Sequence, residues 1–379
     1  MTASTISLSA AQPLEQEKDS FWLRNRRWDL IFIALSVVFV PFPYVAYLVG
    51  RDLLGVNDDV SRNAVNIFVA VAIGGPHMMS TFLRTGLDDS FKERYPMLIR
   101  SSIIIPIVVI SLAFLNLTLL LTIFFFWASL HVLHQVTYIV ELYNHKEHKF
   151  VRQGSAVNPL ARMIDYAVVL TCLFPIAALK ISQGSFDIGS NDLTAVIPDF
   201  FENTWFFLVM SSVFFAALAA YIIKSIREYR AGLLNWPKTI FIVLTVAVAS
   251  TIPALPNLDT AFQGMNTWHS FQYLAITFYI IKIRQQYGDL KKEAPLIAKY
   301  SEGKDSRRLY GFSAMLLGGS LLIFLVVYGM TALVRPGIDP NQHFDIAYYT
   351  AILSFLWIHY YHDHFLFTDF EALDKAYGD

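Results

Sequence analysis

Residues 118–142 read TLLLTIFFFWASLHVLHQVTYIVEL, a run long and apolar enough to cross a membrane as one helix. At 100° per residue, an arc of about 80° on that helix holds His131, His134, Tyr138, Glu141 and, just past the run, His145, with Gln135 at its edge. Lipid cannot solvate such a stripe, so it must face the interior of a bundle or a wet cavity. A hydrogen-bonding seam between helices is one explanation, but two imidazoles one turn apart, with a carboxylate below them, indicate a functional site.

The whole chain has the composition of a membrane protein. Of its 379 residues, 55% are hydrophobic and 16% are charged, whereas a soluble domain carries about a quarter charged residues. We therefore predict an all-α, polytopic transmembrane helical bundle. The ten expected spans are 28–50, 63–84, 99–115, 118–142, 163–181, 204–224, 238–256, 262–283, 309–333 and 345–367.

Loop charges predict the orientation of these spans. Lys and Arg concentrate before the first span and after the even-numbered ones, and basic loops face the cytoplasm. Ten spans with both termini inside satisfy this alternation, whereas nine would break it. We expect one transmembrane domain over 28–367, between cytoplasmic tails at 1–27 and 368–379, in a bacterial inner (plasma) membrane. The first tail has no apolar signal-peptide core.

Charge and cysteine usage exclude several classes of protein. The net charge of −1 gives no electrostatic basis for binding nucleic acid, so the expected partners are membrane lipid and small molecules. The single cysteine, Cys172, excludes internal disulfides and thiolate-rich iron–sulfur or zinc sites.

The second and eighth expected spans each carry one histidine. His77 follows the Gly-Gly-Pro sequence 74–76, where glycine permits close approach of another backbone and proline frees a carbonyl. His269 shares a helix face with Gln272. An interfacial position beside Trp268 would also explain His269. Together with the histidines of 118–142, however, His77 and His269 are candidate metal ligands.

The tenth expected span ends in WIHYYHDH, residues 357–364. On a helix, His359 and His362 lie about 60° apart, which makes both candidate ligands. Asp363 is placed to accept a hydrogen bond from an imidazole and fix its tautomer. His364 points about 140° away from His359 and suits the membrane edge.

Seven of the ten histidines thus lie on four helices, and ionisable side chains within a membrane usually mark function. The candidate metal ligands are His77, His131, His134, His269, His359 and His362. We expect the imidazoles of His77, His134, His269 and His362 to approach within roughly 5 Å of one point, given metal–nitrogen distances near 2 Å. Imidazole ligation suits iron, zinc or copper. By contrast, His145 and His148 are expected to be solvated side chains in a basic loop over 144–152.

Four short patches, 75–77, 131–134, 268–273 and 359–363, resemble the bacterial membrane β-carotene dioxygenases, which split the polyene to give retinal. Members of that family hold a single non-haem iron with histidines from several transmembrane helices. The resemblance implies His77, His131 or His134, His269 and His362 as iron ligands. The chain departs from the family at 78–84, which lacks an aspartate-histidine pair, and it is longer. The identity of the substrate therefore does not carry over.

These observations predict a membrane-embedded non-haem iron oxygenase that uses dioxygen on a carotenoid, isoprenoid or acyl chain from the lipid. Fe(II) is the expected cofactor, ahead of zinc, copper and haem. The residues expected to support the ligands or move protons are Gln135, Tyr138, Glu141, Gln272 and Asp363. Glu141 lies about 10 Å along the helix from His134, so we expect it not to ligate the metal.

Three other functions stay open from the sequence. They are a zinc-dependent intramembrane hydrolase of lipid amides or esters, a haem-binding electron carrier, and a proton-coupled transporter with a histidine relay. Metal content and a visible spectrum of the purified protein distinguish them.

Overall fold

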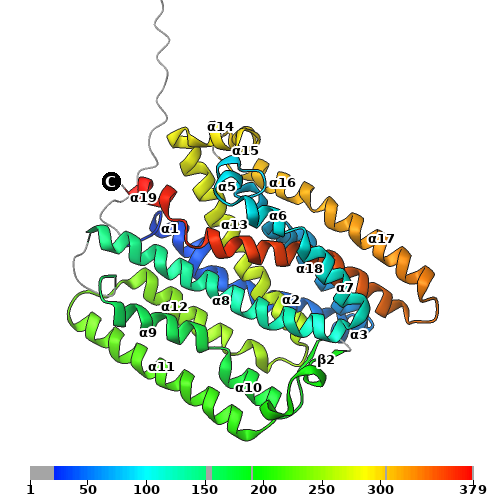
Figure 1. Cartoon of the computed structure of the whole chain (residues 1–379). Helices are drawn as coiled ribbons and strands as arrows, with labels where there is room; N and C mark the ends of the chain where they lie inside the picture. Colours follow the sequence, from blue (N-terminus) through cyan, green and yellow to red (C-terminus); the bar gives the residue numbers. More distant parts are fainter. Residues whose placement is uncertain (1–20, 151–155, 189–190, 304, 378–379) are drawn as a thin grey trace, which may run out of the picture.

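The computed structural model describes residues 21–150, 156–188, 191–303 and 305–377, which form a bundle of helices (Figure 1). Of the described residues, 82% are helical. Strands in the described residues are limited to a hairpin of Asp187–Ile188 (β1) and Asn191–Asp192 (β2). The prediction of an all-α helical bundle is confirmed. Residues 1–20 of the expected N-terminal tail lie outside the described residues.

Eight segments of the described chain are helical, long and apolar enough to cross a membrane. They match the first seven expected spans and the ninth: Arg26–Leu53, Asp58–Leu83, Pro96–Leu115, Leu117–Lys149, Pro159–Ser182, Thr204–Arg230, Trp236–Ala254 and Arg307–Val334. Their length and apolarity indicate an integral membrane protein. The total of ten spans, the orientation and the kind of membrane remain predictions.

Several of these segments combine more than one helix. The α-helices are α1 (Arg26–Asp29), α2 (Pro41–Leu48), α3 (Asp58–Val69), α4 (Gly75–Ser80), α5 (Asp89–Arg94), α6 (Pro96–Ser101), α7 (Ile104–Leu115), α8 (Leu117–Phe150), α9 (Pro159–Thr171), α10 (Phe174–Ser182), α11 (Thr204–Arg230), α12 (Trp236–Ala249), α13 (Leu258–Tyr287), α14 (Asp289–Glu293), α15 (Pro295–Ser301), α16 (Arg307–Leu316), α17 (Gly318–Val334), α18 (Pro340–Leu366) and α19 (Glu371–Tyr377). The π-helical turns are η1 (Leu30–Ala34), η3 (Val49–Leu53) and η4 (Ala70–Gly74). The 3₁₀ turns are η2 (Leu35–Phe39), η5 (Thr81–Leu83), η6 (Thr194–Val196), η7 (Asp199–Phe201) and η8 (Ile252–Ala254).

Two further helices, α13 and α18, occupy the places of the eighth and tenth expected spans. With 30 and 27 residues they are long enough to span a bilayer, but they are not apolar enough to qualify by composition. Their side chains are mostly buried, by α2, α4 and α8 around α13 and by α4, α7 and α17 around α18. A helix enclosed by other helices needs no apolar face toward lipid, so polar residues are tolerated on it.

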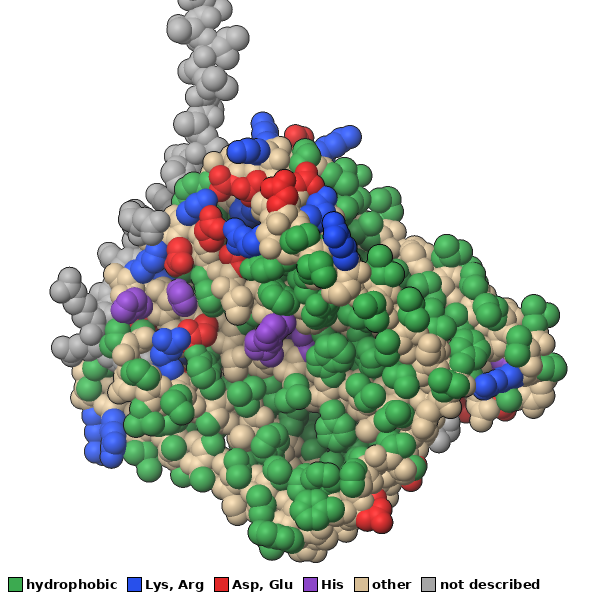
Figure 2. All heavy atoms as spheres, in the orientation of Figure 1, with side chains coloured by type: hydrophobic (Ala, Val, Ile, Leu, Met, Phe, Trp, Pro, Cys, Tyr) green, Lys and Arg blue, Asp and Glu red, His purple; other side chains and the backbone are tan. Residues whose placement is uncertain are grey.

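The apolar helices form the outer surface. Figure 2 shows hydrophobic side chains over most of one face, and charged side chains gathered at the end formed by α5, α14 and α15. Phe215 on α11 and Leu322 on α17 are 58% and 63% exposed. Large exposed apolar patches mark a surface that contacts lipid or another protein.

The helix of residues 118–142 extends further than predicted, and the expected loop from 144 is wrong. Helix α8 continues to Phe150. Polar side chains in its last turns are buried, and they pair with charged and amide side chains of other segments. Lys238 donates to Asn144 at 2.8 Å, and Asn235 donates to Glu147 at 2.8 Å. Because these polar groups are paired with α12 and its N-terminal cap, the helix does not have to end at the apolar boundary.

The end of the chain packs onto the same region. Residues 371–377, which the sequence analysis assigns to a tail, form α19, with Leu373 and Tyr377 buried against α8 and α13. His145 is half-buried and stacks on Phe370 with ring centroids 4.1 Å apart, whereas His148 is exposed, as expected. Helix α19 thus covers one end of the interior helices.

Gly264 permits the closest approach of α13 to the first span. A Cβ added at Gly264 would lie 2.0 Å from the Val40 carbonyl oxygen, where η2 gives way to α2. A backbone carbonyl cannot move aside to relieve this contact as a flexible side chain could. We expect Gly264→Ala to lower the free energy of unfolding by about 2 kcal/mol or more, as overpacking does. Thermal unfolding in detergent measures the change.

Gly329→Ala on α17 is the matched control, because a Cβ there meets nothing within 4 Å. Alanine is the better helix former, so this variant should unfold at the wild-type temperature or above it. Equal melting temperatures for the wild type and Gly264→Ala would show that α13 and the first span are not packed this closely.

Candidate metal centre

Four buried histidines meet in the interior of the bundle. They are His77 on α4, His131 on α8, His269 on α13 and His359 on α18. One nitrogen from each ring can be chosen so that all four atoms lie within 4.8 Å of one another. The expected convergence of four helices is therefore present, although two of the four histidines named for it differ.

The four rings enclose a small central space. Ring centroids of neighbouring histidines lie 4.4 Å apart for His77 and His359, 4.7 Å for His77 and His269, 4.9 Å for His131 and His359, and 5.0 Å for His131 and His269. Across the centre, His269 and His359 are 6.5 Å apart. A metal bound to imidazole nitrogens at about 2 Å fits between rings spaced in this way.

Hydrogen bonds fix which nitrogen of two rings faces the centre. Ser270 donates its hydroxyl proton to Asn266 at 3.2 Å, so its oxygen accepts from His77 Nδ1 at 3.0 Å. Thr81 donates to Asp363 at 3.0 Å, so its oxygen accepts from His359 Nδ1 at 2.5 Å. With protons on both Nδ1 atoms, each Nε2 carries a free lone pair, which is the tautomer a metal ligand needs.

The nitrogens that remain have no hydrogen-bond partner among the described residues. They are Nε2 of His77, His131 and His359 and both ring nitrogens of His269. All four side chains are at most 4% exposed. Buried polar atoms are almost always paired, so converging unpaired nitrogens of this kind are suited to bind a metal ion.

A buried carboxyl group lies beside the site. Asp363 accepts hydrogen bonds at Oδ1 from Thr81 and from Tyr273, the latter at 2.7 Å. Its Oδ2 has no hydrogen-bond partner in the described chain and lies 3.7 Å from His131 Nε2. An ionised carboxylate buried without a counter-charge is costly, and a cation between the imidazoles would supply one.

The local sequence around His77 explains its position. Pro76 has no N–H, so the Ala72 carbonyl loses its usual helical partner, and Tyr310 of α16 donates to it at 2.6 Å. The turn before it, η4, is π-helical. A π turn inserts an extra residue and changes the face on which the following side chains lie, and such turns are frequent at functional sites.

Two expected ligands lie outside the cluster. Both ring nitrogens of His362 are hydrogen bonded, Nε2 with Ser102 at 2.7 Å and Nδ1 with Thr85 at 3.0 Å. His134 is only half-buried and lies 5.7 Å from His364 between ring centroids. The expectation that His134 and His362 join His77 and His269 is wrong. His131 and His134 lie about one helical turn apart on α8, and the more deeply buried of the two, His131, belongs to the cluster.

Two other expected site residues have different partners. Glu141 forms a two-pronged ion pair with Arg162 of α9, at 2.6 and 3.2 Å, and it lies about 15 Å along α8 from His131. Its role in the site, as predicted, has no support in this geometry. Tyr138 stacks on Phe367, with ring centroids 4.9 Å apart, and Phe367 separates it from His131.

Gln135 and Gln272 hold the backbone around the cluster. Gln135 donates to the His269 carbonyl at 3.1 Å and approaches Gln272 at 3.4 Å. Gln272 donates to the Ile33 carbonyl at 2.7 Å. These bonds tie α8, α13 and the first span together beside His269. Both glutamines thus contact the backbone around the cluster, and their expected supporting role stays a prediction.

The sequence analysis did not assign roles to Thr81, Ser270 or Tyr273. A regular spacing could have identified two of them. Each clustered histidine is followed four residues later by a polar side chain that supports the site: Thr81, Gln135, Tyr273 and Asp363. Residues four apart lie on the same helix face. His362 is followed at that distance by Leu366, so the same test would have removed it.

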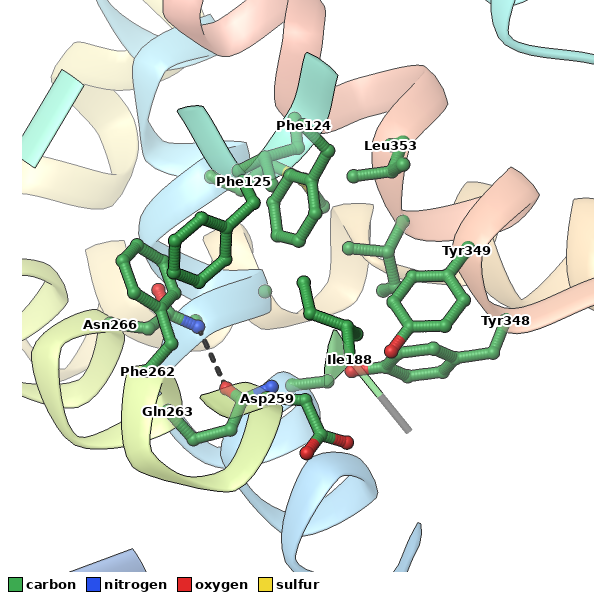
Figure 3. A pocket seen from close by; sticks show the side chains of 16 residues that line it. Phe124, Phe125, Ile188, Asp259, Phe262, Gln263, Asn266, Tyr348, Tyr349 and Leu353 are labelled. Atoms are coloured by element: carbon green, nitrogen blue, oxygen red, sulfur yellow. Dashed lines mark hydrogen bonds between the residues drawn. The ribbon is translucent and has the colours of Figure 1, made fainter. Parts of the chain in front are cut away.

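An apolar pocket lies between the same four helices (Figure 3). The pocket is small, with a cavity volume of about 50 Å³. Phe124 and Phe125 of α8, Phe262 of α13, and Tyr348 and Tyr349 of α18 form much of its wall, and Gly74 and Gly75 line it next to His77. Asn266, also in the wall, accepts from Ser270, the partner of His77. The pocket thus adjoins the histidine cluster.

Comparison of the chain with family models, with curated proteins and with solved structures finds no match.

Removing one imidazole tests the site. We expect His131→Ala to lose most of the bound metal, because one of four converging ligands is gone, and His134→Ala, one turn along α8, to retain it. Elemental analysis of detergent-purified protein measures metal per chain, and size-exclusion chromatography confirms that both variants are folded. Equal metal loss in the two variants would contradict the assignment of His131 to the site and His134 to its outside.

Proposed function

We propose that this chain is a membrane-embedded metal-dependent oxygenase that binds Fe(II) through His77, His131, His269 and His359 and acts on a hydrophobic substrate. The observation that carries the proposal is the set of unpaired, buried imidazole nitrogens facing one space. The eight apolar helices of span length around the site support a substrate drawn from lipid.

The number of ligands favours iron over zinc. Zinc in proteins is usually four-coordinate, so four imidazoles would fill a structural site, and catalytic zinc keeps an open position beside three protein ligands. Ferrous iron accepts more than four ligands, and non-haem iron oxygenases keep positions open for their reactants. When bound, non-haem iron supplies one-electron and dioxygen chemistry.

The chain's own residues supply the surroundings for that chemistry. The Phe and Tyr side chains that line the small pocket beside the cluster keep bulk water away from it. Thr81 and Tyr273 donate to Asp363, which keeps its carboxylate oriented toward His131. Ser270 and Thr81 hold His77 and His359 in the tautomer that presents Nε2 to the metal.

The motif resemblance to the retinal-forming dioxygenases supports the same conclusion. It rests on His77, His131 and His269, which lie in the cluster, while His359 takes the place that the resemblance gave to His362. A polyene or other unsaturated isoprenoid is therefore the substrate class we favour.

A zinc-dependent hydrolase is the second candidate. Asp363 Oδ2 has no hydrogen-bond partner in the described part of the chain and lies beside the cluster, where a base could activate water. Haem is less favoured because two imidazoles, His77 and His131, lie on either side of the His269–His359 line. They occupy the space that a macrocycle ligated by the other two would need.

Anaerobic reconstitution separates these functions. Protein purified without metal is loaded with Fe(II) or with Zn(II), mixed with β-carotene in detergent and exposed to isotopically labelled dioxygen. We expect label in a product aldehyde with Fe(II) and none with Zn(II). His131→Ala should give no labelled product with either metal. A Zn(II)-dependent, oxygen-independent product from a lipid ester or amide would favour the hydrolase, and no bound metal under any loading would favour proton transport.

A further inference from the structure

Two histidines that the cluster leaves out lie close to each other. His134 on α8 and His364 on α18 have ring centroids 5.7 Å apart. Two imidazoles that share one metal ion, each bound through a nitrogen at about 2 Å, have ring centroids roughly 5–6 Å apart. His134 is half-buried and His364 is exposed, and Figure 2 shows histidine side chains at the molecular surface. The pair is therefore spaced to bind a metal ion and accessible from outside.

Both rings of this outer pair are free to bind a ligand. Neither imidazole has a hydrogen-bond partner among the described residues. His362 differs, because Ser102 and Thr85 occupy both of its nitrogens. Imidazole suits iron and zinc, the two metals considered for the cluster. Two protein ligands are fewer than the three or four of catalytic and structural zinc sites, so an ion held by this pair would exchange readily.

One aromatic ring contacts both the outer pair and the cluster. His134 follows His131 by three residues, about 4.5 Å along α8. The ring centroid of Phe367 lies 5.7 Å from that of His131 and 5.1 Å from that of His134. Because the four clustered histidines are at most 4% exposed, an ion reaches them only if a covering side chain moves. Phe367 is placed to be that side chain.

The turn that carries Phe367 is held to the bundle weakly. It joins α18 to α19 and is not part of either helix. Asp369 in this segment pairs with Arg84 at 3.6 Å, and Lys375 of α19 pairs with Asp289 at 3.1 Å. Apart from Arg84, these side chains are 33 to 40% exposed, and exposed ion pairs contribute little to stability. The turn can therefore open locally while α18 stays folded.

We propose that His134 and His364 form a second, exchangeable site for a divalent transition-metal ion, which takes up the ion on its way to the cluster, and that Phe367 gates the passage. The inference concerns metal uptake. It rests on the metal centre of the proposed function, but not on the reaction that the protein catalyses. It also gives a role to two histidines of these helices that the cluster does not use.

Zinc binding tests the outer site by itself. Untagged His131→Ala protein, whose cluster is expected to lose its metal, is stripped with a chelator and titrated with Zn(II) by calorimetry in detergent. Adding His134→Ala or His364→Ala should weaken zinc binding at least about tenfold, because changing even a group that supports a ligand costs about 10–100-fold in affinity. Adding His148→Ala, which removes another exposed histidine of α8, should leave it unchanged. Unchanged zinc affinity without His134 and without His364 would overturn the outer site.

The rate of loading tests the passage to the cluster. Metal-free protein with an intact cluster is mixed with Co(II), whose visible absorption reports binding to imidazole. At low cobalt concentration, His134→Ala and His364→Ala should load at least about tenfold more slowly than the wild type and reach the same final metal content. His148→Ala should load at the wild-type rate. If removing His134 or His364 leaves the loading rate unchanged, the pair has no role in uptake.

Phe367→Ala tests the gate. Removing the ring should speed both loading of cobalt and its release to a chelator roughly tenfold, because a lower barrier acts in both directions. Phe370→Ala is the matched control, since that ring lies in the same segment but contacts Tyr138 and His145. Release that is faster without faster loading would mean that the variant only weakens the metal site. That result, or wild-type rates in both directions, would overturn the gate.

The proposed function and this inference fail in different ways. A wild type whose only bound cobalt depends on His134 and His364 would reject the metal centre at the cluster, and the uptake role with it. Normal cobalt loading of the cluster, at a rate that does not depend on His134 or His364, would retain the metal centre and reject the outer site as its entrance.

Discussion

The structure depends on one constraint: imidazole nitrogens buried inside a membrane bundle need a partner. A buried polar group left unpaired costs about 1–3 kcal/mol, and one nitrogen from each of the four rings lies within 4.8 Å of the other three. Burial this complete would not persist at that cost without compensation. A metal ion bound there would satisfy several of these nitrogens at once, and it would place a positive charge beside the Asp363 carboxyl group.

The arrangement of helices follows from the same need. Helices α13 and α18 carry polar residues on several faces, and they lie inside apolar helices such as α7 and α17 that can face lipid. Close packing around α13 is possible because Gly264 lets it touch the backbone at Val40. Polar residues on these interior helices are shielded from lipid by the apolar outer helices, which lowers the cost of burying them within the membrane.

Much of this could be predicted from the sequence. Apolar runs of span length gave eight of the observed helices, because hydropathy determines what can face lipid. Histidines within the ten expected spans identified the four helices of the site, two of which, α13 and α18, are not among those eight. Helix periodicity predicts the face on which a side chain lies but not how deeply it is buried in the bundle. It therefore could not distinguish His131 from His134, or His359 from His362. Those choices depend on partners from other helices, Ser102 and Thr85 in the case of His362. Glu141 was misassigned for the same reason, since its partner Arg162 lies on α9.

X-ray absorption at the metal edge of purified, reconstituted protein tests the central claim most directly. If the four histidines hold one metal ion, the spectrum will show a shell of nitrogen neighbours at about 2 Å, with the outer-shell scattering of about four imidazole rings. His131→Ala should lose that pattern. A protein that binds no metal, or a spectrum with only oxygen neighbours and no imidazole scattering, would contradict the account.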